Sequence, residues 1–142
     1  MKKLSLLLVL ALIATSAVWA QNEVKPAKFE NVTWHRVVLV NFKSGKVGRA
    51  KEIIKTYKAA GNAAGLKNPQ TYWLMSGEYD MMTVWTMEGG LSDMEWDVSP
   101  DGIKWRAEMV KKLGSEEAVQ KLQQEFQDLR LSSTSYIARK EI

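Results

Sequence analysis

Few side chains in this sequence could carry out acid–base, thiol or metal chemistry. The 142 residues include no cysteine and a single histidine, His35. The chain therefore lacks a thiol nucleophile, a disulfide and a zinc–cysteine site, and one subunit cannot build a multi-histidine metal site. Histidine titrates near neutral pH and can act as a general base. At a strand start beside Trp34 and Arg36, however, a structural role is favoured, so His35 is only a weak catalytic candidate.

A group of acidic residues invites a calcium hypothesis. The group consists of Asp93, Glu95, Asp97 and Asp101. In the spacing of an EF-hand loop, Val98 occupies the position that needs glycine and Lys104 the position that needs glutamate. A solvated loop and a helix cap explain these acids better, and we expect neither a metal nor any other cofactor.

Aromatic side chains are the remaining candidates for a binding site. Six tryptophans and seven methionines are many for this length, and they could line a cavity for a flat apolar molecule or simply fill a core. The candidate ligand-binding residues are Trp96, Trp105, Tyr72 and Trp85. Trp96 and Trp105 flank the start of a predicted helix, where we expect the mouth of a pocket.

The first 20 residues have the pattern of a secretory signal peptide. Lys2 and Lys3 precede the uncharged run Leu4–Val18, and Val18-Trp19-Ala20 offers a cleavage site. The run is shorter than the roughly 20 residues that a spanning helix needs. We therefore expect cleavage near Ala20, export to the periplasm or the exterior, and no membrane attachment afterwards. Residues 21–31 read as a polar leader, and residues 32–142 as a single domain.

The positive charge of the chain does not indicate a nucleic-acid partner. The net charge is +4, and two of these charges, Lys2 and Lys3, leave with the signal peptide. Nucleic-acid binding needs a clustered basic face. The nearest candidates, which Glu52 interrupts, are Lys46, Arg49, Lys51, Lys55 and Lys58. They fit the solvent-exposed side of a helix.

The mature chain alternates between strand and helix patterns. Trp34–Phe42 is rich in β-branched and aromatic residues, which predicts a strand, and apolar residues then recur at helical spacing from Lys46 to Ala64. Thr71–Ser76 and Met81–Met87 read as a hairpin. Ser99-Pro100-Asp101 begins a helix that either bends at Gly114 or is followed there by another. After Ser132–Ser135 ends the helical region, Tyr136–Lys140 reads as a final strand.

The order of these elements predicts an α+β fold. It is the β-α-β-β-α-β order of the ferredoxin-like fold, with one antiparallel sheet. The predicted strands carry apolar residues on both faces, as with Val38 and Val40 on one face of the first strand and Val37 and Leu39 on the other. Because the chain has no helix left to cover the second face, we expect a second copy of the sheet to cover it in a homodimer.

From Trp34 to Lys140 the chain resembles the dimeric α+β-barrel superfamily, near the antibiotic-biosynthesis-monooxygenase-like and stress-responsive barrel families. The resemblance rests on the passages VVLVNFKSGKVGRAKEI, SGEYDMMTVWTM and SPDGIKW. It implies two ferredoxin-like subunits with their sheets pressed together, and any site in the cleft between sheet and helices. The superfamily includes cofactor-independent monooxygenases, haem-degrading enzymes, isomerases, decarboxylases and members without known activity.

Haem degradation does not fit the chain. The haem-degrading branch has an Asn near the first strand, a Trp near the second helix start and an iron-binding His on that helix. Trp96 fits the Trp position, but Asn41 stands at the far end of its strand and Arg106 stands near the position of the iron ligand. Three hypotheses remain, and the third of them is a purely structural module that binds a partner and has no internal cavity. The first is an exported dimer that binds a small apolar or aromatic molecule, and the alternative is a cofactor-independent monooxygenase or isomerase acting in the sheet–helix cleft.

Overall fold

Strand β1 (Val32–Phe42) is central to the sheet of the protein. The computed structural model describes residues 25–142, of which Asn31–Ile142 form one unit. Residues 25–30 contain neither helix nor strand. The predicted signal peptide and the first part of the leader lie outside the described residues.

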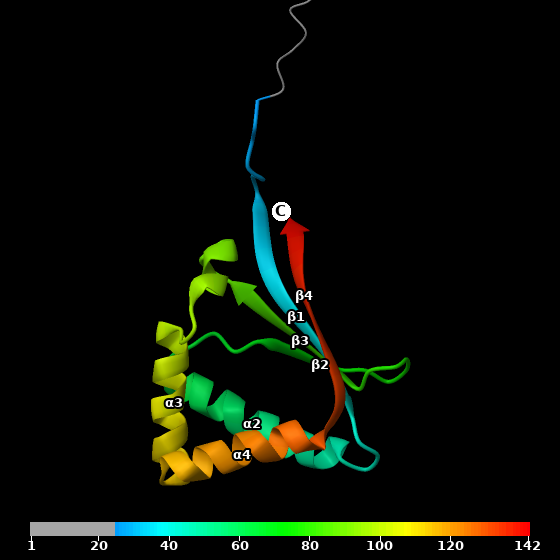
Figure 1. The fold of residues 1–142 in the computed structure, drawn as a ribbon, viewed down its shortest axis with the longest axis vertical. Helices are drawn as coiled ribbons and strands as arrows, with labels where there is room; N and C mark the ends of the chain where they lie inside the picture. The colour runs from blue at the N-terminus through cyan, green and yellow to red at the C-terminus, as the bar shows by residue number, and fades with distance from the viewer. Residues whose placement is uncertain (1–24) are drawn as a thin grey trace, which may run out of the picture. The chain divides into compact units, whose positions relative to one another are not determined.

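The structure confirms the predicted α+β class with one four-stranded antiparallel sheet (Figure 1). Its order is β2-β3-β1-β4, where β2 is Gln70–Trp73, β3 is Met81–Met87 and β4 is Arg130–Glu141. The two longest strands, β1 and β4, are neighbours, so β4 forms one edge of the sheet and the short β2 forms the other.

Helices cover one side of the sheet (Figure 1). They are α2 (Val47–Ala63), α3 (Pro100–Leu113) and α4 (Glu116–Leu129), with a short 3-10 helix, η2 (Gly90–Glu95), before α3.

The predicted start of α3 is confirmed, because Ser99 Oγ accepts a hydrogen bond from Gly102 N at 3.0 Å. Gly114 adopts a φ of 92° and ends α3 in the left-handed conformation that glycine tolerates. Two separate helices therefore follow one another. None of the helices within residues 25–142 is both long and apolar enough to cross a membrane.

The core lies between the sheet and these helices. Phe42, Val40 and Met81 of the sheet pack with buried residues of α2 such as Ile53. A second buried cluster joins the helices to one another and contains Ala60, Met109 and Val119. Burial of these side chains is the main favourable contribution to folding, and no cysteine takes part.

Two predicted strand boundaries were wrong. Ser132–Ser135 was predicted to end the helical region, yet β4 begins at Arg130 and continues through these residues, because β1 offers a long hydrogen-bonding partner that local propensity does not reveal. The strand predicted at Thr71–Ser76 is shorter and ends at Trp73. Met75 therefore lies outside the sheet and is 95% exposed.

The two faces of the sheet differ in what covers them. In an antiparallel pair, directly opposed residues share a face, and the register places Trp73, Met81 and Met87 on the helix side. The opposite side, here called the open face, carries Tyr72 and Val84, the latter beside Val37 of β1. The apolar residues predicted on both strand faces are thus present, with helices over one face only.

Candidate functional site

Part of the helix side of the sheet stays accessible, and we call it the Arg36 strip. It consists of Trp85 of β3, Arg36 of β1 and Ile137 of β4, which are direct cross-strand partners. Trp85 is 40% exposed and Ile137 is 38% exposed, and Arg36 is also exposed. A large ring, a cation and an aliphatic side chain therefore form one continuous row across three strands.

The rows on each side of the strip are more enclosed. On one side, Trp34 lies against the start of η2, where a Cβ on Gly90 would stand 3.6 Å from the Trp34 ring. On the other side, Thr83 is only 2% exposed. The Arg36 strip thus lies between the row of Trp34 and the row of Thr83.

Arg36 has an unusual electrostatic setting. Its Nε contacts Ser135 Oγ at 3.4 Å, and its guanidinium forms no ion pair with any residue from 25 to 142. Arginine is always charged and presents a planar set of donors that matches a carboxylate or phosphate. The Arg36 guanidinium, which has no ion-pair partner within residues 25–142 and lies between two apolar side chains, can therefore bind the acidic group of an otherwise apolar molecule.

The structure does not bring the four predicted ligand-binding residues together. Trp85 lies in the Arg36 strip, whereas Tyr72 is on the open face. Trp105 packs against Tyr57 with ring centroids 5.4 Å apart and donates a hydrogen bond from Nε1 to the Tyr57 carbonyl, so it contributes to helix packing. Trp96 follows η2 and is 57% exposed.

His35 also lies on the open face, opposite Thr86 of β3. Its Nε2 is 2.9 Å from Thr33 Oγ1 and its Nδ1 is 3.4 Å from Thr86 Oγ1. Because neighbouring residues of a strand point to opposite faces, His35 and Arg36 are separated by the sheet. The weak catalytic candidate is therefore not placed in the sheet–helix cleft.

A network of ion pairs lies elsewhere, on the exposed surface of the helices. Arg49 of α2 donates to Glu125 of α4 from Nε at 2.6 Å and from Nη2 at 2.9 Å, and from Nη1 to Glu52 at 2.8 Å. These contacts raise the pKa of Arg49 and lower that of Glu125. Burial raises the pKa of Tyr57 to about 12. This network joins α2 to α4, and no group of three His, Asp or Glu side chains within residues 25–142 could hold a metal ion.

Sequence reasoning missed Arg36 and Ile137 as candidate site residues. Arg36 is the charged residue within the strand pattern WHRVVLVNF, and an unpaired charge inside such a pattern was the available signal. Ile137 is 101 positions away from Arg36, and only the β1–β4 register brings the two together.

One solved structure with a similar fold supports this architecture. A comparison with protein-family models finds no match, and neither does a comparison with curated proteins. A NIPSNAP family protein with unknown function from Agrobacterium tumefaciens matches 82% of this chain and 95% of its own, with a TM-score of 0.51 and 10% identity. A second NIPSNAP family protein from that organism has a TM-score of 0.45 and 14% identity, matching 80% of this chain and 90% of its own.

An uncharacterized NIPSNAP domain protein from Burkholderia xenovorans matches 75% of this chain and 91% of its own, with a TM-score of 0.36 and 14% identity. Among these three, the first likeness alone is close enough to carry an argument. At 10% identity it shows the fold, which is the α+β, ferredoxin-like architecture expected from the sequence.

Proposed function

We propose that the protein binds a small apolar or aromatic molecule that carries one acidic group. The observation that carries this proposal is Arg36, a guanidinium without an ion-pair partner in the described chain, between exposed Trp85 and Ile137. Trp85 and Ile137 would receive the apolar body, and Arg36 would bind the acid through paired hydrogen bonds. Binding is favoured over a monooxygenase or isomerase reaction because the polar groups of the strip, a guanidinium and the Ser135 hydroxyl, do not serve as general bases without an activating partner.

Calorimetric titration with 2-naphthoate, and with uncharged 2-naphthamide as the matched probe, tests this proposal. We expect naphthoate to bind and Arg36→Gln to weaken it about tenfold, the lower end of the range for a charge-assisted hydrogen bond at an exposed site. Lys112→Gln removes the same charge from α3 and should leave the affinity unchanged. If naphthoate and naphthamide bind equally well, or if Arg36→Gln and Lys112→Gln weaken naphthoate binding equally, the proposed role of Arg36 is refuted.

We also propose a homodimer formed through the open face. The centre of this face is apolar, with Leu39 opposite Met82 and Val37 opposite Val84. Its outer rows are polar, as with His35 opposite Thr86. An apolar centre with a polar rim is the usual composition of a protein interface, and an apolar patch of this kind is rarely left in water.

Light scattering of the mature protein tests the dimer. We expect twice the mass of one chain, and we expect Leu39→Lys to give a folded monomer because it places a charge at the apolar centre. Gln120→Lys on the exposed side of α4 is the matched control and should remain dimeric. A wild-type monomer at micromolar concentration would overturn this proposal.

Export is proposed from the pattern of Met1–Ala20 alone. Expression of the full chain in a Gram-negative host should give a periplasmic protein that starts at Gln21. Intact mass spectrometry of the fractionated cells checks this, and a full-length cytoplasmic product would contradict it.

A further inference from the structure

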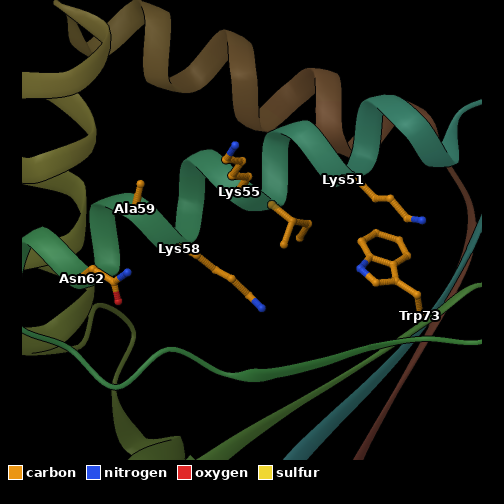
Figure 2. Close-up of a pocket in the computed structure, with 7 residues that line it drawn as sticks. Lys51, Lys55, Lys58, Ala59, Asn62 and Trp73 are labelled. Carbon is orange, nitrogen blue, oxygen red and sulfur yellow. The ribbon is translucent and has the colours of Figure 1, made fainter.

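Three lysines follow one another along α2 and line one pocket, and we call them the lysine row. Figure 2 shows the side chains of Lys51 and Lys58 extending toward the sheet, whereas the Lys55 nitrogen points the opposite way. Lys51, Lys55 and Lys58 follow the helical repeat and extend over about 10 Å of the helix axis. None of them forms an ion pair with a residue of the described chain. Arg49 of the same helix differs, because Glu52 and Glu125 hold it on both sides.

Trp73 of β2 faces this row from the other side (Figure 2). Its ring lies 5.0 Å from Lys51 Nζ, a cation–π distance. The ring of Phe42, 6.3 Å away between centroids, packs against it and ties it to the core. The indole is therefore an aromatic surface anchored to the core beside three lysines.

The lysine row and Trp73 line an open pocket of about 430 Å³, here called the lysine groove. This volume lies within the usual range for small-molecule sites, roughly 300–1,000 Å³. Ile54 lines it between Lys51 and Lys55, Ala59 and Asn62 line it further along α2, and none of its described lining residues is acidic. The groove thus combines positive charge, one aromatic surface and no internal counterion.

We propose that the lysine groove is a second binding site, which takes a small aromatic molecule bearing at least two anionic groups, such as phosphates or carboxylates. The aromatic part would stack on Trp73, and the anionic groups would lie along Lys51, Lys55 and Lys58. This site is separate from the Arg36 strip, and the proposal stands on its own observations.

The charge of the groove selects this class of ligand. Three ammonium groups spread over about 10 Å repel one another, so one anionic group would leave part of the row uncompensated, and an uncharged molecule would leave all of it. The lysines also fit a small polyanion better than a duplex, since they line one open pocket next to an indole and not an extended basic face.

Titration with three probes, in magnesium-free buffer at low salt, tests the proposal. The probes are ATP, which has both a ring and charges, tripolyphosphate, which lacks the ring, and adenosine, which lacks the charges. We expect ATP to bind most tightly, ahead of tripolyphosphate by about fivefold or more, since stacking of a base on an aromatic side chain contributes about 1–3 kcal/mol. Adenosine should bind most weakly. In ¹⁵N-resolved NMR spectra, ATP should shift the indole N–H signal of Trp73.

Substitutions in the groove locate the site. Lys55→Gln should weaken ATP binding about two- to fivefold, as expected for one exposed charge pair. Adding both Lys51→Gln and Lys58→Gln to this variant should abolish ATP binding. Lys112→Gln on α3 is the matched control for charge and should have no effect. Trp73→Phe keeps a ring against Phe42 and should bring the affinity for ATP closer to that for tripolyphosphate.

Several results would overturn the proposal. If Lys112→Gln weakens ATP as much as Lys55→Gln does, binding follows overall charge and no site exists. If tripolyphosphate binds as tightly as ATP to the wild-type protein, Trp73 is not part of the site. Arg36→Gln should leave ATP binding unchanged. The proposal for the lysine groove and the proposal for the Arg36 strip can therefore fail independently.

Discussion

Thr83 is a buried polar residue whose hydroxyl group tests the packing between the sheet and the helices. It lies on the helix side of β3, opposite Val38 of β1 and Thr71 of β2. Its side chain is 2% exposed, and Oγ1 has no hydrogen-bond partner among the described residues. A buried hydroxyl of this kind costs about 1–3 kcal/mol. Thr83→Val replaces the hydroxyl with a methyl group of similar size, so we expect the substitution to stabilise the fold.

The expected gain is about 1–2 kcal/mol in the free energy of unfolding, the lower part of the range for an unsatisfied buried hydroxyl. For a domain of this size, that corresponds to a rise of about 4–8 °C in Tm. Urea unfolding at pH 7, followed by tryptophan fluorescence, measures the free energy, and the dependence on urea should stay the same. Ser133→Ala, which removes a hydroxyl at an exposed position of β4, is the control and should change stability by about 0.5 kcal/mol or less.

The opposite result would refute this reasoning directly. A loss of 1 kcal/mol or more in Thr83→Val would mean that the hydroxyl is hydrogen-bonded in the folded protein. Substituting both Thr71 and Thr83 then distinguishes an unpaired hydroxyl from one that is bonded to a buried water. Thr71 Oγ1 is suited to this comparison because it is also buried without a partner among the described residues. If each hydroxyl is unpaired, the two Val substitutions should add, whereas a shared bridging water would give a coupling of about 0.5 kcal/mol or more.

Three further predictions concern the helices. Met109→Ala should cost about 2–5 kcal/mol because Met109 is fully buried, whereas Val98→Ala, at a 61% exposed position, should cost little in the same urea assay. Ser99→Ala should cost about 1 kcal/mol by removing the N-cap of α3, and Ser99→Asp should restore it. Burial raises the pKa of Tyr57 from 10.0 to about 12, so the stability linked to its protonated form is complete below pH 10 and is lost as the pH rises toward 12. Between pH 9 and pH 11, the free energy of unfolding should fall less for Tyr57→Phe than for the wild type. An equal fall in the two proteins would contradict this.

Local patterns in the sequence predicted most elements of the fold. The cap at Ser99 and the break at Gly114 depend on residues within one or two helical turns, so their signals are visible in a short segment. The same is true of β1 and β3, whose apolar and β-branched composition predicts a strand in any context. The element order then gave the α+β class before any contact was known.

Contacts between distant segments decided the rest. The polar run Ser132–Ser135 became part of a strand because β1 lies beside it, and hydrogen bonding to a partner strand is not encoded in local composition. Which of two apolar faces the helices cover is equally non-local, because alternation along a strand makes both faces look alike.

Both candidate sites depend on the same kind of contact. Arg36 gains Trp85 and Ile137 as neighbours only through strand register, and the lysines of α2 line a pocket only because β2 presents Trp73 to them. The sequence by itself determined most of the helices and strands, the absence of thiols and the single imidazole. Within residues 25–142, the tertiary structure decided which charged side chains lie without an ion-pair partner beside aromatic rings, because such neighbourhoods join residues that are far apart in the chain.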